Sequence, residues 1–193
     1  MIPLVCAYAA LHPDTAAALA GEDVEWADTS GSDDAYYWLL RTLWQEQAGA
    51  ILVEQDIVPY PGAIASLRAC PERWCGVPYT VGRTFGVWHG LTKYAPEIMA
   101  AHPYTLRLVR DHHWRGLDSA VIALLRAQGE RPHWHWPAAE HRNPECAPPE
   151  HVFANCQDCG GPLRFAELRA GPGASACSRC GRPVYYFGHG GAT

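Results

Sequence analysis

The sequence predicts an α/β fold followed by a small zinc ribbon, and three observations support this. Short apolar runs of strand length alternate with amphipathic stretches of helical period over 1–143. The Pro-rich segment 144–150 then interrupts the alternation and is typical of a linker. Two Cys-x-x-Cys pairs follow within 151–193. We therefore expect one α/β domain, long enough to bury its own core, and a separate metal-held module.

Three strands are predicted in the N-terminal part of the chain. The run 2–9 is mostly apolar and has the length of a strand that is buried on both faces. The segment 24–28 is a second candidate strand, and the apolar run 50–53 is a third. In sheets built from alternating strands and helices, ligands bind at the carboxyl ends of the strands. We therefore expect functional residues directly after these runs.

A helix is predicted between the second and third strands, because apolar residues recur at helical spacing over 36–44. Ser32 is expected to be its N-cap. Asp33 and Asp34 then lie in the first turn, where their charge suits the helix dipole, and Gly49 ends the element.

Further helices are predicted at 62–69 and at 96–101, the second of which begins with a proline. The region 76–92 between them is rich in glycine and aromatic residues and is expected to be a loop. Asp118 is expected to cap an amphipathic helix that runs to Gln128.

The overall charge limits the classes of partner. The formal net charge is −5 and the isoelectric point is near 6.0, so the field of the whole protein does not attract nucleic acid. A nucleic-acid partner would therefore need a local basic patch. No apolar run is long enough to span a membrane, and the N-terminus has no basic leader, so we expect no membrane partner.

The two cysteine pairs at the C-terminal end predict one structural zinc ion. Cys156 and Cys159 form the first pair, and Cys177 and Cys180 form the second. A glycine follows each pair and lets the backbone turn tightly beneath the metal. Four thiolates make a closed tetrahedral site, which leaves no position for substrate. Two disulfides or free thiols are the alternative, but the absence of a secretion signal favours a reducing compartment.

The zinc ribbon has two possible roles that the sequence does not separate. It either braces the main domain or contacts nucleic acid or another protein through a local basic face. That face would be made by Arg164, Arg169, Arg179 and Arg182. The remaining cysteines are interpreted as small buried apolar side chains; they are Cys6, Cys70, Cys75 and Cys146.

The third strand ends in two carboxylates, Glu54 and Asp56, which are spaced by two residues. Residues with this spacing point to the same side of an extended chain and can hold a divalent cation through oxygen. By itself the pattern is also compatible with solvated turn residues.

The chain resembles the small GT-A-type glycosyltransferase-like proteins of actinobacteria and their phages. In the run 51–59, the resemblance is to the strand that ends in a DxD-like motif, here in the form Glu54-Gln55-Asp56. It covers about 1–143 and implies a GT-A-like (Rossmann-like) domain that binds a nucleotide-sugar. Further blocks that carry it, in order, are 71–75 with Tyr79, then 90–94, 114–118, 133–135 and 140–141.

The resemblance implies a catalytic metal site. Asp56, the last residue of the acidic motif, would bind Mn²⁺ or Mg²⁺, which bridges the donor diphosphate and stabilises the leaving group. A late histidine often completes the coordination, and His141 is the candidate. His133 and His135 alternate along a predicted strand, share one face and are the rival ligands. Each of these histidines could instead be an ordinary packed or hydrogen-bonded side chain.

The resemblance also assigns donor and acceptor residues. Ala7 and Tyr8 at the end of the first strand, and Asp28 after the second, match positions that hold the base and the ribose. Glu54 replaces the usual aspartate and is one methylene longer, so its contact with ribose or metal-bound water is expected to differ. Asp118 matches the residue that removes the proton from the acceptor hydroxyl in inverting members, although a helix N-cap would also explain it.

Three functions therefore remain as hypotheses. The first is a metal-dependent glycosyltransferase, located in the bacterial cytoplasm or, if phage-encoded, in that of the host, with a modified DNA base as one acceptor suggested by analogy. The second is a non-catalytic module that binds nucleic acid or protein through the ribbon. The third is a metal-dependent hydrolase in which Asp56, His133, His135 and His141 activate water.

Overall fold

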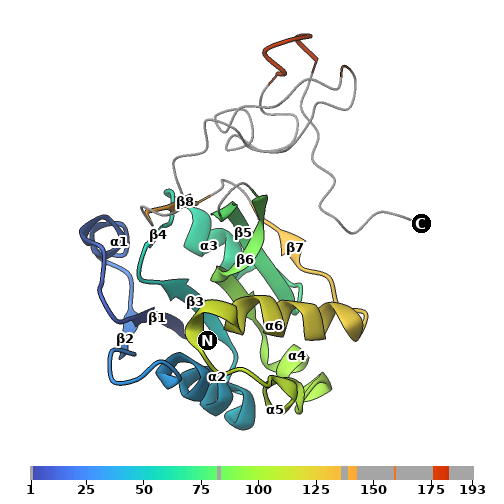
Figure 1. Cartoon of the computed structure of the whole chain (residues 1–193). Helices are drawn as coiled ribbons and strands as arrows, with labels where there is room; N and C mark the ends of the chain where they lie inside the picture. The colour runs from blue at the N-terminus through green and yellow to red at the C-terminus, as the bar shows by residue number, and fades with distance from the viewer. Residues whose placement is uncertain (1, 82–83, 136–138, 143–158, 160–175, 183–193) are drawn as a thin grey trace.

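The computed structural model describes residues 2–81, 84–135, 139–142, 159 and 176–182. Its centre is a mixed six-stranded sheet with the strand order β2-β1-β3-β6-β5-β7 (Figure 1). β1 is parallel to β2 and β3, β6 is antiparallel to β3 and β5, and β7 is parallel to β5. The strands are β1 (Leu4–Tyr8), β2 (Val24–Asp28), β3 (Ala50–Glu54), β5 (Trp74–Val81), β6 (Thr84–Tyr94) and β7 (His133–Trp134). The α/β class is thus confirmed, with a sheet compatible with a Rossmann-like arrangement.

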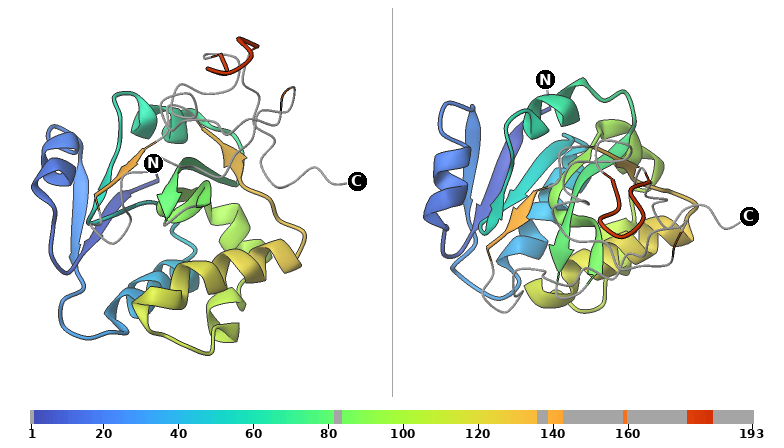
Figure 2. Two further views of the ribbon diagram at one scale, coloured as in Figure 1. Left: turned by 45° about the horizontal axis from the view of Figure 1, so that its top comes forward. Right: turned by 90° about the horizontal axis from the view of Figure 1, so that it is seen from above.

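Helices lie on both faces of this sheet. α2, α4, α5 and α6 lie on one side and α3 on the other, as two further views also show (Figures 1 and 2). The helices are α1 (Pro13–Ala18), α2 (Ala35–Glu46), α3 (Ala63–Ala69), α4 (Pro96–Ala101), α5 (Thr105–Leu108) and α6 (Trp114–Ala127). In the described part of the chain, no helix is both long and apolar enough to cross a membrane.

The two faces of β1 explain why its sequence is apolar throughout. Val5 and Ala7 pack into the core formed with α2 and α6, whereas Leu4 and Cys6 pack into the core formed with α3. Successive side chains of a strand point to opposite faces, so a strand covered on both faces needs apolar residues at every position. The strands predicted at 2–9, 24–28 and 50–53 are confirmed, as are the helices at 62–69 and 96–101.

A second, two-stranded sheet joins distant parts of the chain. β4 (Ile57–Val58) follows β3 directly, and β8 (Glu140–His141) lies near the end of the α/β domain. They pair antiparallel, with Ile57 opposite His141 and Val58 opposite Glu140. This pairing brings His141 to the turn that carries Asp56.

The prediction of a loop at 76–92 is wrong, because this region belongs to a long antiparallel hairpin of β5 and β6. Two of its glycines lie where a neighbour packs directly against the backbone. A Cβ on Gly76 would overlap Val87, and a Cβ on Gly90 would lie 2.6 Å from the Tyr79 hydroxyl. Glycine in a strand often marks such a close approach, so here it signals tight packing rather than a turn.

The N-cap predicted at Asp118 is also wrong. α6 begins at Trp114 and is capped by His113, whose Nδ1 accepts a hydrogen bond of 3.1 Å from the Arg115 amide. Asp118 therefore lies inside the helix, about one turn from its start. Helix capping does not explain this aspartate.

The start of α2 differs in a smaller way from the prediction. The helix begins at Ala35, and Asp34 rather than Ser32 occupies the N-cap position. Ser32 instead donates a hydrogen bond of 2.6 Å to Asp34 Oδ1, and the Trp38 indole donates to Asp34 Oδ2. The Asp34 carboxylate thus connects the residues before α2 to its first turn by accepting hydrogen bonds from two side chains.

The predicted linker, 144–150, lies outside the described residues, as does most of the predicted ribbon at 151–193. In the ribbon, only 159 and 176–182 are described.

Candidate functional site

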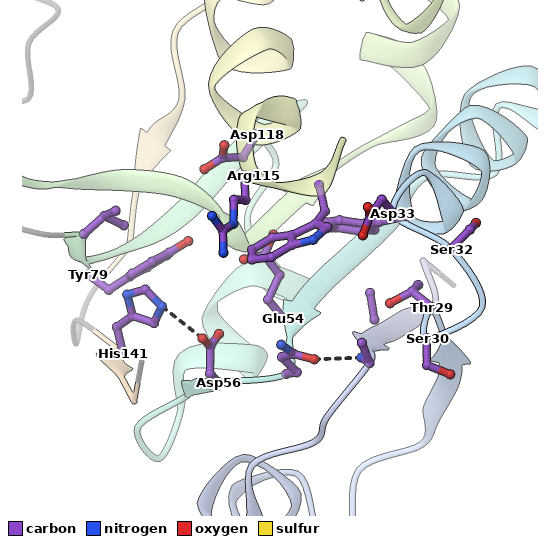
Figure 3. A pocket seen from close by; sticks show the side chains of 16 residues that line it. Thr29, Ser30, Ser32, Asp33, Glu54, Asp56, Tyr79, Arg115, Asp118 and His141 are labelled. Carbon is purple, nitrogen blue, oxygen red and sulfur yellow. Dashed lines mark hydrogen bonds and ion pairs between the residues drawn. The ribbon is translucent and has the colours of Figure 1, made fainter. Parts of the chain in front are cut away.

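A pocket of about 540 Å³ lies at the carboxyl ends of β1, β2 and β3 (Figure 3). Ala7, Ser30 and Glu54 line it from the ends or following turns of these three strands. α6 and β8 add further polar residues to the lining, among them Asp118 and His141. Residues that end or directly follow the three strands therefore line one common pocket.

Asp56 and His141 form a close pair of ionisable side chains in this lining. The His141 Nε2 atom lies 3.2 Å from Asp56 Oδ2, and the two side chains are 11% and 22% exposed. The Arg142 amide donates a 2.7 Å hydrogen bond to the Asp56 carbonyl, and the Tyr79 ring packs edge-on against His141 at 5.5 Å. The β4–β8 ladder and these contacts hold the pair in place. It offers one carboxylate oxygen and one imidazole nitrogen to a cation.

The pair is not a complete metal cage made of protein ligands. Within the described chain, no third His, Cys, Asp or Glu ligand atom lies within 4.8 Å of both partners. A cation held here would therefore need further ligands from water or from a bound anion. Hard divalent cations in phosphate-binding sites are commonly held in this way, by one or two carboxylates plus substrate phosphates.

Glu54 lies beside this pair, where its charged form is disfavoured. The pKa of Glu54 is raised to about 8, first by burial and then by the charges of Asp118 and Asp56. The Tyr36 hydroxyl and His141 oppose part of this rise. Gly90 makes room for the carboxylate, because a Cβ there would lie 2.8 Å from Glu54 Oε2. The pocket thus keeps one carboxylate protonated near neutral pH until a cation or a donor group compensates its charge.

Asp118 and Arg115 enter the pocket from α6, opposite Glu54 (Figure 3). They are three residues apart on the helix and so share one face. Burial raises the pKa of the Asp118 carboxyl, partly offset by a hydrogen bond from the Ser119 amide. The Arg115 guanidinium lies 5.2 Å from the ring centre of Trp114, which also lines the pocket. The lining therefore combines a carboxylate that can act as a base, Asp118, with a guanidinium group that can bind an anion, Arg115.

The sequence alone predicted no role for Arg115. The mistaken N-cap at Asp118 placed Arg115 before the helix, so the three-residue spacing of the pair was not recognised. With the helix begun at Trp114, this spacing would have indicated that both residues face the same way.

Gln55 has a positioning role that the sequence analysis also missed. Its Oε1 atom accepts hydrogen bonds from the amides of Ala9 and Ala10, at 2.7 and 2.8 Å. The His12 amide donates to the Gln55 carbonyl at 2.9 Å. Gln55 thus ties the turn after β1 to the acidic motif. The sequence did contain a signal for this role. Gln55 lies between Glu54 and Asp56, so if those two side chains point to one side of an extended chain, the Gln55 side chain points to the other.

Of the three residues predicted to hold the base and the ribose, only one lines the pocket. Ala7 lines the pocket, whereas the Tyr8 side chain is not part of the lining and packs edge-on against Trp26 at 6.3 Å. Asp28 is also outside the lining, and its Oδ1 accepts a 2.8 Å hydrogen bond from the Ser30 amide. Hydrogen bonds from the Ser30 side chain and then from this amide lower the pKa of the Asp28 carboxyl. Because Ser30 lines the pocket, Asp28 positions a lining residue without contacting the pocket itself.

The two rival metal ligands are not in this pocket. His133 and His135 lie on or next to β7, at the opposite edge of the sheet from β2, close to Cys70 and Cys75. A single site made from Asp56 and all three histidines is therefore not compatible with the structure.

The C-terminal cysteines form a cluster that could bind a metal such as zinc. The ligand atoms of Cys159, Cys177 and Cys180 all lie within 4.8 Å of one another, and the sulfurs of Cys159 and Cys177 are 3.8 Å apart. Two thiolates on a tetrahedral zinc ion are separated by about 3.8 Å. Gly181 has a φ of 72° and donates its amide to the Cys177 carbonyl, as expected for the predicted tight turn. Cys156 lies outside the described residues.

Comparisons of the chain with protein-family models, with curated proteins and with solved structures gave no match.

Proposed function

We propose that this protein is a glycosyltransferase that moves a sugar from a nucleotide-sugar donor to an acceptor hydroxyl and uses a divalent cation. The observation that carries the proposal is the placement of the Asp56–His141 pair in the same pocket as Asp118, at the carboxyl ends of β1 to β3. A cation-binding pair and a carboxylate base in one pocket meet the two main chemical needs of this reaction.

The donor set of the pair fits Mn²⁺ or Mg²⁺. A carboxylate oxygen suits both ions, and the imidazole nitrogen of His141 favours Mn²⁺, since imidazole prefers transition metals. Because Asp56 and His141 supply only two ligands, coordination positions remain for two diphosphate oxygens and for water. When bound, the cation would neutralise charge that develops on the departing diphosphate.

Other lining residues suit a nucleotide-sugar. Arg115 is in the pocket lining and can bind phosphate oxygens through its planar fork of N–H donors. Ala7 leaves space for a base or ribose at the end of β1, and Glu54 can accept from a ribose hydroxyl once a cation lowers its pKa. Asp28 supports this region through Ser30.

Asp118 is proposed as the general base. The acceptor oxygen attacks the anomeric carbon while Asp118 takes the hydroxyl proton. The bond from that carbon to the diphosphate oxygen breaks, and the oxygen leaves with the electron pair. A carboxylate whose pKa is raised is a stronger base than an ordinary aspartate.

A metal-dependent hydrolase is the second candidate, because the Asp56–His141 pair could equally orient an attacking water. The metal site of such a hydrolase would have two protein ligands rather than the four predicted from the sequence, because His133 and His135 lie outside the pocket. The two functions differ in the product: a hydrolase releases free sugar without an acceptor, whereas a transferase forms a new glycosidic bond.

At the C-terminal end, we propose that Cys156 joins Cys159, Cys177 and Cys180 around one structural Zn²⁺ in a zinc ribbon. Arg179 and Arg182 are exposed beside this cluster and suit a polyanionic acceptor such as DNA. A non-catalytic binding module would use the same residues, but its binding would not depend on Asp56 or Asp118.

The decisive experiment is a thermal-shift screen with nucleoside diphosphates and nucleotide-sugars, each with and without Mn²⁺. A ligand at about 100 times its dissociation constant should stabilise the protein by about 2.7 kcal/mol. Asp56→Asn should abolish the Mn²⁺-dependent shift. The matched control is Asp14→Asn, the same change at a half-exposed carboxylate outside the pocket lining, and it should keep the shift.

Absence of a shift with every nucleotide would contradict the proposal and favour the binding module. A shift that survives in Asp56→Asn would separate nucleotide binding from the proposed metal site. Product analysis with the ligand that binds would then distinguish transfer from hydrolysis.

A further inference from the structure

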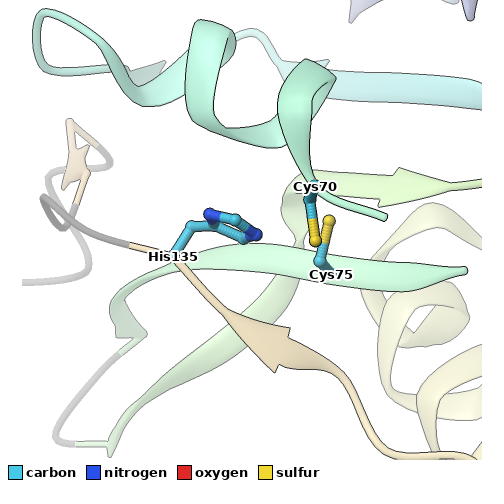
Figure 4. Close-up of side chains that lie close together, drawn as sticks. All are labelled: Cys70, Cys75 and His135. Carbon is cyan, nitrogen blue, oxygen red and sulfur yellow. The ribbon is translucent and has the colours of Figure 1, made fainter. Parts of the chain in front are cut away.

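We propose that Cys70, Cys75, His133 and His135 form a second, structural zinc site at the β7 edge of the central sheet. From the sequence alone, the two cysteines are expected to be small buried apolar residues and the two histidines to be rival ligands of the pocket cation. The structure brings the four residues together, and none of them lines the pocket. Figure 4 shows three of them, Cys70, Cys75 and His135.

The strand register places three of the four residues on one face. Cys75 in β5 is the direct partner of His133 in the parallel strand β7. His135 lies two residues further along, and its amide donates a 2.9 Å hydrogen bond to the Gly76 carbonyl, which continues the pairing. Residues two apart on a strand share a face, so Cys75, His133 and His135 all face the same side.

Cys70 reaches this face from α3. It is the C-cap of that helix, with φ −67° and ψ 128°, so the chain turns out of the helix there. The Glu72 amide points back and donates a 3.4 Å hydrogen bond to Cys70 Sγ. Figure 4 shows the two sulfurs side by side, with the His135 ring pointing toward them.

Two interatomic distances have the values expected at a tetrahedral zinc ion. The Cys70 Sγ and His133 Nδ1 atoms are 3.6 Å apart, and His133 Nδ1 and His135 Nε2 are 3.2 Å apart. Ordinary Zn–S and Zn–N bond lengths with tetrahedral angles give about 3.5 Å between sulfur and nitrogen and about 3.3 Å between two nitrogens. The ligand atoms of Cys70, Cys75 and His135 lie within 4.8 Å of one another, and His133 reaches this group of three through its contacts with Cys70 and His135.

A buried lysine also holds Cys70 beside the sheet. Lys93 is the antiparallel partner of Cys75, is 2% exposed and donates a hydrogen bond to the Cys70 carbonyl. This bond ties the end of α3 to the β5–β6 hairpin and so keeps Cys70 near Cys75.

Such a site would be structural rather than catalytic. Two cysteines and two histidines close the coordination shell and leave no position for substrate. The ion would join the end of α3, β5 and the two-residue edge strand β7, and so link positions that are 63 residues apart in the chain. It would therefore stabilise the edge of the sheet independently of the proposed transferase function.

The test begins with the full-length Cys177→Ser/Cys180→Ser double variant, which removes two of the proposed ribbon ligands. Purified without chelators, it should retain one zinc ion per chain by elemental analysis. X-ray absorption at the zinc edge should give two sulfur and two nitrogen ligands. A zinc ion held instead at Asp56 and His141 would show oxygen and nitrogen ligands and would overturn the proposal.

Two further substitutions in this background test the ligands. His135→Ala should remove the zinc ion, whereas Cys6→Ser, at a buried cysteine in another part of the sheet, should retain it. A zinc-free double variant, or a Cys70–Cys75 disulfide in protein purified under reducing conditions, would also overturn the proposal. If His135→Ala does not fold, the zinc count and ligand shell of the double variant still decide the question.

Discussion

His141 Nε2 lies 3.2 Å from Asp56 Oδ2, although 85 positions separate the two residues in the chain. The short β4–β8 ladder makes this contact, and neither strand is longer than two residues. The proposed cation site therefore depends on a long-range pairing that has little intrinsic stability of its own. A bound cation would in turn strengthen it.

Replacing His141 with alanine should weaken Mn²⁺ binding by at least about tenfold, equivalent to about 1.4 kcal/mol, because one of only two protein ligands is lost. Isothermal titration calorimetry with Mn²⁺ and a nucleoside diphosphate would measure this. Glu140→Gln is the control, since Glu140 is the neighbouring residue of β8 but bonds to Tyr60 and Arg142 outside the lining. Equal losses in both variants would point to disruption of β8 instead.

Asp118→Asn should reduce the transfer rate by about 10² to 10⁴-fold while donor binding persists, because it removes only the proposed base. Its melting temperature should stay the same or rise, since His113 caps α6 and a partly buried charge is removed. Kinetics and thermal melts together test this. Asp111→Asn, in the loop before α6, should keep full activity; a normal rate in Asp118→Asn would refute the assigned role.

Gly90→Ala should destabilise the protein by about 1–3 kcal/mol and weaken donor binding, because the new methyl group would collide with Tyr79 and Glu54. Gly116→Ala is the control, and it should stabilise the protein instead. A Cβ there meets nothing within 4 Å, and alanine favours the helix by about 1 kcal/mol. Urea unfolding curves of the two variants should therefore shift in opposite directions. A stable Gly90→Ala protein with normal binding would show that the contact at Glu54 is unimportant.

His89 should make the protein sensitive to acid. It is buried between Tyr36 and Tyr94, neither ring nitrogen has a hydrogen-bond partner among the described residues, and burial lowers its pKa from 6.5 to about 3. As the pH falls below 6.5, the unfolded chain takes up a proton that the folded chain excludes. This single group therefore costs about 2 kcal/mol of folding stability by about pH 5.

His89→Phe should remove this part of the pH dependence, whatever its effect on stability at neutral pH. Unfolding free energies of the wild type and the variant, measured from pH 7 to 5, should therefore diverge. Parallel curves would mean that His89 accepts a proton in the folded state.

Local sequence patterns predicted most of the elements that build the pocket. The runs at 2–9, 24–28 and 50–53 are strands because their side chains are apolar over the length of a strand, which is a property of neighbouring residues. The acidic end of β3 was likewise visible as Glu54 and Asp56. The family resemblance and the activity that it implies remain predictions.

Where the predictions were wrong, tertiary packing had overridden a local signal. Gly76 and Gly90 suggested a loop, but they occur in strands because Val87, Tyr79 and Glu54 need the space of a missing side chain. Asp118 suggested an N-cap, but α6 extends further toward its N-terminus, and Leu117 in that first turn is fully buried.

The sequence by itself determined the α/β class, the strands that carry the pocket and the cysteine pairs, because these depend on residue type and short spacing. Only the tertiary structure decided which distant side chains meet. It joined His141 to Asp56 through β8, and it moved His133 and His135 to Cys70 and Cys75 through the register of β7 with β5. Strand register is set by burial and pairing across the whole sheet, and a one-residue shift would turn every side chain to the other face.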